Sequence, residues 1–202
     1  QALLNTLDIC LKNKKVSFLK DEIIQIKKLN KQWISTSRNN NQIKSDAIIL
    51  CNSLNALNLI GYKTYNVKLK PVLGQAIEIY TDDLEIDLLS LPRHFNINGK
   101  NILPIAKNRI IIGSTDEYKT DPEENVFGKL TDFIEKRPKW LRKAKITNKW
   151  FGVRSRPEGE PSPILRSLED GLILCTGFYK NGFLLAPACS KWVANEIKDY
   201  LS

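Results

Sequence analysis

The chain has 202 residues, of which 42% are hydrophobic and 26% charged. This composition is typical of a folded globular protein and argues against disorder. No apolar run approaches the roughly 20 residues of a transmembrane helix, and no signal peptide opens the chain. The formal charge of +9 is spread along the sequence without a basic tail, which favours a basic surface over a nucleic-acid site. We therefore expect neither a nucleic acid nor a membrane as partner, and the sequence leaves a homo-oligomer open.

The four cysteines and the single histidine show no spacing typical of a metal site. Cys10, Cys51, Cys175 and Cys189 form no CxxC pair, and His94 has no Cys or His neighbour. We therefore predict no metal site. The cysteines are expected to be buried, reduced thiols of a cytoplasmic protein.

The first residue raises a separate expectation. The chain contains no methionine and begins with Gln1. A translated protein begins with Met or with a small residue that removal of Met exposes. We therefore expect a fragment that lacks its natural N-terminus.

The N-terminal quarter of the chain is predicted to contain one helix and several short strands. Leucines at helical spacing indicate an amphipathic helix at the start, and the apolar patterns of residues 16–19, 23–28 and 32–37 are typical of strands. The continuous apolar run at residues 47–51 predicts a strand buried on both faces, as in a parallel sheet. Ser53 can cap a short helix that ends at Ile60.

The middle of the chain shows a different apolar pattern. Alternating residues predict antiparallel strands, at residues 67–69, 75–80, 95–97, 102–105 and 109–114. Pro122 suits the first position of a helix that ends near Lys136. Because this block lies between two continuous apolar runs, 47–51 and 172–175, we expect an α/β (α+β) protein in which a mainly antiparallel lobe is inserted into a parallel-sheet lobe.

The clearest candidate for a ligand site is the stretch at residues 171–187, GLILCTGFYKNGFLLAP. It predicts a buried strand, a glycine turn and the start of a helix. Backbone N–H groups and the positive end of a helix dipole meet at such a turn, which suits an anionic or electron-rich ligand group. The alternative is a purely structural strand–helix crossover.

Four stretches resemble one family in the family's own order. They are KPVLGQAIEI at residues 70–79, RIIIGST at 109–115, WFGVR at 150–154 and GFYKNGFLLAP at 177–187. Together they resemble the D-amino acid oxidase-like FAD-dependent oxidoreductases (DAO family), most closely the glycine oxidase type. The family's N-terminal GxGxxG fingerprint is absent, so the resemblance covers only the family's C-terminal portion.

The resemblance implies a cofactor, a reaction and a division into lobes. The cofactor would be FAD, and the reaction would oxidise the C–N bond of a small amino acid or amine by hydride transfer to flavin. Residues 1–66 and 145–202 would form part of the FAD-binding lobe, and residues 67–144 the substrate-binding antiparallel lobe. Without the glycine-rich fingerprint, the chain alone is expected to bind FAD poorly and to be inactive.

The resemblance also implies roles for single residues toward the substrate. Arg154 matches the arginine that clamps the substrate carboxylate as a two-pronged ion pair, although it could also be a surface arginine after a strand. Lys180 stands where relatives usually carry a second arginine, and Asn101 where they usually carry a substrate-side tyrosine. Gly74 and Gln75 would have a structural role. No catalytic acid–base pair is expected, because hydride transfer to flavin requires none.

The resemblance places the cofactor contacts at two sites in the chain. The backbone of Ile23 would meet the adenine end of FAD. The glycine turn and the following helix start would lie beside the flavin ring, where their N–H groups stabilise negative charge on reduced flavin. The residues of this second site are Gly177, Phe178, Tyr179, Lys180, Asn181, Gly182, Phe183 and Leu184.

The chain departs from the family pattern at two further places. The text after Arg154 is SRPEGEPSPIL, without the usual Asp–Gly, and the strand at residues 47–51 ends in Cys51–Asn52 instead of a small residue and glycine. These departures permit an alternative function, a non-catalytic relative that acts as a binding or scaffold protein.

Overall fold

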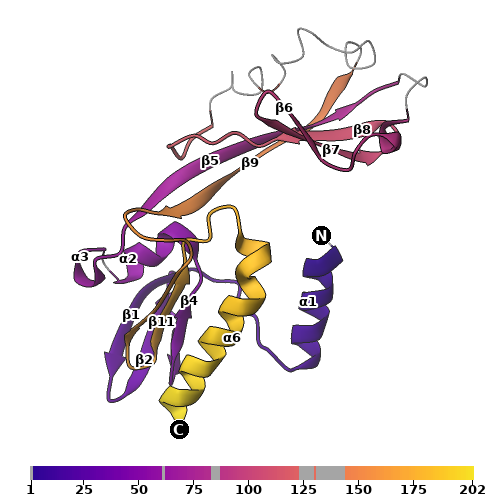
Figure 1. Cartoon of the computed structure of the whole chain (residues 1–202). Coiled ribbons are helices and arrows are strands. Elements are labelled where there is room, and N and C mark those ends of the chain that lie inside the picture. Colours follow the sequence, from indigo (N-terminus) through magenta and orange to yellow (C-terminus); the bar gives the residue numbers. More distant parts are fainter. Residues whose placement is uncertain (1, 61, 83–86, 123–129, 131–143) are drawn as a thin grey trace. The chain divides into compact units, whose positions relative to one another are not determined.

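The computed structural model describes residues 2–60, 62–82, 87–122, 130 and 144–202. The chain divides into two compact units, Gln1–Ile48 and Ile49–Ser202. Figure 1 gives the element labels used below. The mixed class of helices and sheets that the sequence predicts is confirmed.

The first unit contains one helix and one antiparallel sheet. The helix is α1 (Ala2–Asn13), and the sheet has the order β1–β2–β3, with β1 at Ile23–Leu29, β2 at Gln32–Ser37 and β3 at Gln42–Ser45. The predicted helix and the strands near residues 23–28 and 32–37 are therefore confirmed. The strand predicted at residues 16–19 is wrong, because Val16 and Phe18 are exposed and no other strand pairs with this segment in the described structure. Local alternation alone does not make a strand without a neighbour to complete its hydrogen bonds.

A small sheet carries the C-terminal candidate stretch. Its order is β10–β11–β4, with β10 at Ile164–Glu169, β11 at Leu172–Thr176 and β4 at Ile48–Leu50. The prediction that residues 47–51 and 172–175 share a sheet is confirmed. All five residues of β11 are buried, as its continuous apolar run predicts. The antiparallel partner β10 was not predicted from the sequence.

Helix α6 (Gly182–Leu201) follows β11 and packs against it (Figure 1). Ile173 and Cys175 of β11 share a cluster with Cys189 and Val193 of α6. Burial raises the pKa of the Cys175 thiol to about 12, so this thiol is protonated at neutral pH. The prediction of buried thiols is correct for Cys175 and Cys189.

The same prediction is wrong for the other two cysteines. Cys10 lies on α1 and Cys51 directly follows β4, and both are exposed. An exposed helix position and a strand end leave a thiol open to solvent even when the neighbouring sequence is apolar.

Short helices connect β4 to the central sheet. They are η1 (Ser53–Asn55), α2 (Ala56–Ile60) and α3 (Tyr62–Tyr65). Ser53 does not cap them, because it lies inside the first turn, and Asn52 precedes that turn without a side-chain cap. The backbone carbonyl of Ser53 instead accepts a hydrogen bond from Thr176 Oγ1 at 3.1 Å, which ties this connection to β11.

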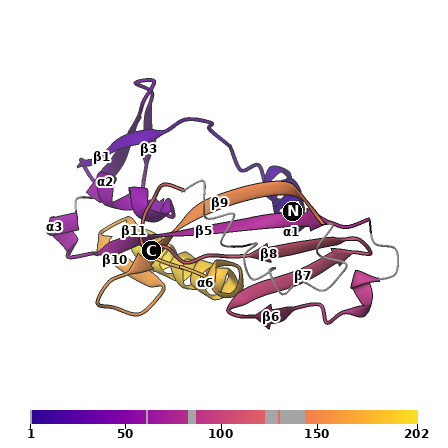
Figure 2. The same ribbon diagram turned by 90° about the horizontal axis from the view of Figure 1, so that it is seen from above.

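The largest sheet has five antiparallel strands in the order β6–β7–β8–β5–β9 (Figure 2). The strands are β5 (Leu69–Tyr80), β6 (Phe95–Ile97), β7 (Lys100–Ala106), β8 (Arg109–Gly113) and β9 (Lys145–Pro157), and η2 (Leu88–Ser90) lies between β5 and β6. The separate antiparallel sheet is thus confirmed, although the predicted strands 67–69 and 75–80 form one long strand, β5. Most of the helix predicted between Pro122 and Lys136 lies outside the described residues.

Strand β9 runs beside β5 from the pair Leu69–Pro157 to the pair Tyr80–Lys145. Residues 145–157 therefore belong to the antiparallel sheet, although the sequence grouped them with the FAD-binding lobe. The assignment of the two lobes to cofactor and substrate stays a prediction.

One face of this sheet forms the main hydrophobic core. The core residues of β5 and β8 alternate along their strands, as expected for the face of a sheet that packs on a core. The whole core comprises Ile77, Ile79, Leu88, Ile102, Ile110, Ile112 and Leu130. The opposite face of the same strands carries the candidate site.

The core predicts a large difference between two isoleucines of the sheet. Ile77 is 0% exposed and Ile97 is 39% exposed. We expect Ile77→Ala to lower the free energy of unfolding by about 3 kcal/mol, because it leaves a cavity in a packed core. The matched change Ile97→Ala should lower it by well under about 1 kcal/mol. Urea denaturation monitored by tryptophan fluorescence measures both, and equal losses would mean that the core is misplaced.

Candidate functional site

The candidate site lies on the face of the sheet opposite the core. Residues directly opposite each other in an antiparallel pair share a face. Gly74 pairs with Gly152 and Ala76 with Trp150, so alternation places Trp150, Gly152 and Arg154 on one face of β9. A Cβ atom at Gly152 would meet nothing within 4 Å. The centre of this face is therefore a floor of small residues, open at Gly152, between an aromatic ring and a guanidinium.

Asn101 lies on the same face, two strands from β5. It pairs with Gly113 of β8, which in turn pairs with Ala76. Its side-chain oxygen accepts a hydrogen bond from Asn96 Nδ2 at 3.2 Å and lies 3.1 Å from His94 Nε2. Asn101 thus shares the face with Arg154, but its side-chain oxygen contacts His94 and Asn96. Its substrate role stays a prediction.

The guanidinium of Arg154 lies over Gly74. A Cβ atom at Gly74 would fall 2.2 to 2.4 Å from the three nearest guanidinium atoms. Real Cβ atoms do not approach that closely, so only glycine leaves room for this placement. Gly74 therefore positions Arg154, a more specific structural role than the sequence indicated.

The fork of Arg154 is directed at the segment that follows β8. One terminal nitrogen donates to Ser114 Oγ, and the other lies 3.4 Å from the Thr115 carbonyl and 3.3 Å from Asp116 Oδ1. The side chain of Arg154 is 23% exposed, so the fork is partly open to solvent. It can bind a small carboxylate from solution in exchange for the contact with Asp116.

A buried network holds this segment against β5. Thr115 Oγ1 accepts from the backbone N–H of Gln75 at 3.0 Å and donates to Glu117 Oε1 at 2.6 Å. Gln75 Nε2 also donates to Glu117, at 2.9 Å. Burial opposes ionisation of Glu117, but hydrogen bonds from Lys119, Thr115 and Gln75 outweigh it and lower the pKa of Glu117. The ionised carboxylate binds the side chains of Thr115 and Gln75, while backbone hydrogen bonds from Thr115 to Gln75 and between Glu117 and Leu73 hold the chain on both sides of Asp116.

The glycine turn between β11 and α6 is built as the sequence predicts. Gly177 has φ = +70°, and a Cβ atom there would lie 2.8 Å from Pro157 Cγ, so the turn requires glycine. The N–H of Tyr179 donates to the Ser155 carbonyl at 3.1 Å. This bond ties the turn to β9 one residue from Arg154.

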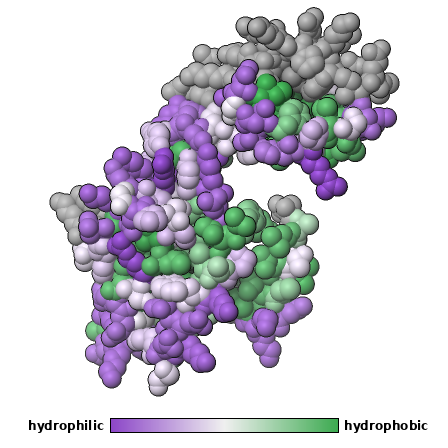
Figure 3. Space-filling view, in the orientation of Figure 1, coloured by the Kyte–Doolittle hydropathy of each residue, from purple (hydrophilic) through white to green (hydrophobic). Residues whose placement is uncertain are grey.

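The first turn of α6 presents backbone N–H groups that lie before the first helical hydrogen bond. Asn181 precedes the helix without a side-chain cap, and the N–H of Leu185 is the first to reach back four residues, to Asn181. The N–H groups of Gly182, Phe183 and Leu184 therefore precede the helical ladder. Phe183 is 74% and Leu184 is 78% exposed. Hydrophobic residues also reach the surface near this end of α6 in Figure 3. Uncapped N–H donors beside apolar side chains fit a flat ring with polar edges, such as flavin.

Asp116 joins the turn to Arg154 and was missed by the sequence analysis. Its second oxygen, Oδ2, lies 2.5 Å from Lys180 Nζ, and Tyr179 Oη donates to Oδ1 at 3.3 Å. The hydrogen bond to Asp116 raises the pKa of Lys180. The sequence signal for Asp116 was its position directly after RIIIGST, the stretch at residues 109–115.

Ile23 and Phe178 are the two remaining predicted cofactor contacts. Ile23 lies on β1 in the first unit, where it is half-buried and pairs with Ser37, so its contact with adenine stays a prediction. Phe178 packs against the cluster of Ile173 and Cys189. Its role is at least partly to hold the turn on the core.

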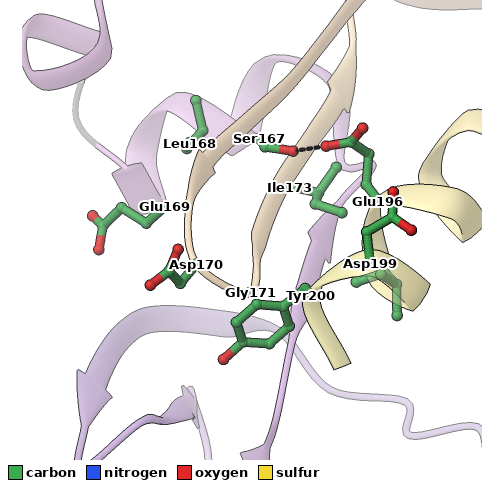
Figure 4. Close-up of a pocket in the computed structure, with 10 residues that line it drawn as sticks. Ser167, Leu168, Glu169, Asp170, Gly171, Ile173, Glu196, Asp199 and Tyr200 are labelled. Atoms are coloured by element: carbon green, nitrogen blue, oxygen red, sulfur yellow. Dashed lines mark hydrogen bonds between the residues drawn. The ribbon is translucent and has the colours of Figure 1, made fainter. Parts of the chain in front are cut away.

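A separate acidic cavity of about 440 Å³ lies at the β10–β11 turn and the C-terminal end of α6 (Figure 4). Glu169, Asp170, Glu196 and Asp199 line it, and Ser167 Oγ donates to Glu196. None of the site residues predicted from the sequence lines this cavity.

The described residues include neither a metal-binding cluster nor a membrane-spanning helix. They contain no group of three or more His, Cys, Asp or Glu side chains arranged to hold a metal ion. Within the same part of the chain, no helix combines the length and apolarity needed to cross a bilayer. Cytoplasmic location and oligomeric state stay predictions.

Comparison with known proteins places these features in a wider context. Residues 1–196 match the family model DAO, FAD dependent oxidoreductase. The chain is 30% identical to a glycine oxidase of Pseudomonas aeruginosa over 169 residues, which are 80% of this chain and 44% of that protein. It is 27% identical to a glycine oxidase of Bacillus licheniformis over 131 residues, 63% of this chain and 34% of that protein.

Solved structures show a similar fold. The glycine oxidase from Geobacillus kaustophilus aligns with a TM-score of 0.75 at 21% identity, over 90% of this chain and 49% of that one. The iminodiacetate oxidase from Chelativorans sp. BNC1 aligns with a TM-score of 0.76 at 17% identity, over 98% and 55%. The chain thus spans about half the length of these proteins or less. The resemblance that the four sequence stretches indicated is confirmed.

Proposed function

Because this chain belongs to the family of FAD-dependent oxidoreductases, we propose that it carries the substrate-binding sheet and the flavin-ring turn of an amino-acid or amine oxidoreductase. FAD is the cofactor of the family. The observation that carries the proposal is Asp116, which contacts both Arg154 of the sheet and Lys180 of the turn. The two parts that the motifs indicated, anchor and turn, therefore meet at one place.

Arg154 is the group that binds the substrate carboxylate. Its planar fork suits a bidentate carboxylate contact, and its partial burial strengthens that contact relative to bulk water. Gly152 beside it leaves room for a small substrate on the sheet. Trp150 limits that room at the other end of the floor.

The turn and the start of α6 hold the flavin ring. The N–H groups of Gly182, Phe183 and Leu184 would donate to the electron-rich edge of the ring, and the helix dipole favours negative charge there. When bound, FAD supplies the acceptor for the hydride from the carbon that bears the amine. The protein's part is to bind and orient the substrate, and no side chain need act as acid or base.

Relatives support a small amino-acid substrate without fixing which one. Glycine and iminodiacetate, the compounds named for two similar enzymes, carry one and two carboxylates respectively. The non-catalytic alternative has less support, because the curated relatives are named as oxidases.

Cofactor binding tests the proposal. The sequence contains no GxGxxG, the motif that normally holds the pyrophosphate. We expect the 202-residue chain alone to purify colourless and to show no saturable FAD binding at micromolar concentrations. The protein expressed from its complete reading frame should be yellow. Absorbance near 450 nm, roughly the usual flavin band, measures both. A tightly flavinated 202-residue chain would refute the division of cofactor binding between the two parts, and a colourless complete protein would refute the function.

A further inference from the structure

Asp116 is the strongest feature of the site that the proposed function leaves unexplained. One carboxylate oxygen lies 3.3 Å from Arg154 Nη1 and also accepts from Tyr179 Oη, and the other lies 2.5 Å from Lys180 Nζ. Asp116 is thus paired with Arg154 and Lys180, the two cations that we assign to the substrate carboxylate. It is an internal counter-ion at a substrate anchor.

The contacts of Asp116 are reachable from solvent. Its side chain is 39% exposed and that of Lys180 is 47% exposed. Ion pairs with this exposure contribute little to stability, because water and salt screen them. A ligand carboxylate can therefore share or displace them without unfolding the segment, which the Gln75–Thr115–Glu117 network holds independently.

The charges around Arg154 determine how the binding of a ligand depends on the ligand's charge. Arg154 and Lys180 are countered by Asp116, and a third cation, Arg156, lies over the rings of Tyr118 and Tyr179, 5.9 and 5.4 Å from their centroids. Every negative charge on a ligand is attracted by the cations and repelled by Asp116. Asp116 therefore repels both carboxylates of a dicarboxylate but only one group of a monocarboxylate.

We propose that Asp116 is a specificity-determining residue that favours substrates with one carboxylate over substrates with two. The proposal rests on the proposed function, because it takes Arg154 as the carboxylate anchor. Asp116 acts through its charge on the anchor and takes no part in bond breaking. Asp116 thereby reduces the gain in affinity that a second carboxylate would bring at this site.

Binding of two simple carboxylates tests this inference without turnover. Acetate and malonate are titrated into the FAD-loaded protein at pH 7.5 by isothermal calorimetry. Removing one negative charge about 6 Å from the ligand should strengthen binding by about tenfold per ligand charge at low salt. Asp116→Asn should therefore raise the ratio of malonate to acetate affinity by about tenfold, and added salt should shrink the increase. Asp116→Glu, which keeps the charge, should leave the ratio as in the wild type.

Asp121→Asn is the matched control, because Asp121 is an exposed acid whose carboxylate accepts a hydrogen bond from Thr120 Oγ1. It makes the same change in net charge and should not alter the ratio. An unchanged ratio in Asp116→Asn, or an equal change in Asp121→Asn, would overturn the inference alone, provided that Arg154→Ala weakens acetate. If Arg154→Ala leaves acetate binding intact, the anchor itself is wrong, and the proposed function falls together with the inference.

Discussion

Replacing Arg154 by Ala in the FAD-loaded protein should lower kcat/KM for a small amino acid by about 30- to 900-fold, which corresponds to about 2–4 kcal/mol of transition-state stabilisation. The reason is that the guanidinium is partly buried over Gly74 and presents its fork toward the open side of the sheet. Arg154→Lys should fall between wild type and Arg154→Ala, because lysine keeps the charge but loses the planar fork. Steady-state kinetics measure all three.

The control for this prediction is a substrate without the carboxylate. Alanine and ethylamine differ in this group, and ethylamine turnover should be nearly the same in the three proteins. If Arg154→Ala slows both compounds equally, Arg154 supports the structure of the sheet and does not bind the substrate. Intact alanine turnover in Arg154→Ala would exclude the anchor role directly.

The second large effect is expected at Gly74. Gly74→Ala would place a Cβ atom 2.2 to 2.4 Å from the Arg154 guanidinium, so the guanidinium must move by more than about 1 Å to reach ordinary contact distance. A misplacement of about 1 Å can lower catalytic efficiency by about 10²-fold. We expect a loss of this size for amino-acid substrates, with a melting temperature close to that of the wild type because a side chain, not the backbone, gives way.

Gly152→Ala provides the matched comparison for this experiment. Gly152 lies directly opposite Gly74 on β9, and a Cβ atom there would meet nothing within 4 Å. Its effect on the position of Arg154 should therefore be small. Equal losses in the two variants would show that any added methyl group harms the floor of the site and that Gly74 has no special relation to Arg154. A Gly74→Ala protein with unchanged kinetics would exclude the positioning role.

The sequence predicted the parts of the site that depend on short-range order. Alternation along β9 is enough to place Trp150, Gly152 and Arg154 on one face, and the two glycines of the 177–182 turn are enough to predict a strand–turn–helix. The relation between Gly74 and Arg154 could not be predicted, because it depends on the register between β5 and β9. Register between distant strands is set by tertiary packing.

Asp116 shows the same limit more clearly. Its partners Arg154 and Lys180 lie 38 and 64 residues away in sequence. Only the pairing of β8, β5 and β9, together with the bond from Tyr179 to Ser155, brings the three together. An acid after a strand is common in surface segments, so the position of Asp116 after GST was too weak a signal to select it.

In the fold, errors arose where local propensity had no tertiary partner. The apolar pattern of residues 16–19 resembles a strand, but no neighbouring strand pairs with it in the described structure. Conversely, β10 has few strong β-formers and is a strand because β11 offers it a partner. The strand β11 was predicted correctly because a strand that is buried on both faces has apolar residues at successive positions.

The measurement that most directly tests the proposed function is an anaerobic titration of the complete, FAD-loaded protein with small amino acids, glycine among them, monitored by flavin absorbance. We predict that at least one amino acid bleaches the band of oxidised flavin. The Arg154→Ala protein should reach the same final spectrum with this amino acid, but about 30- to 900-fold more slowly. A flavin that stays oxidised with every amino acid, or that bleaches equally fast without Arg154, would contradict the assignment of this sheet as an amino-acid oxidoreductase site.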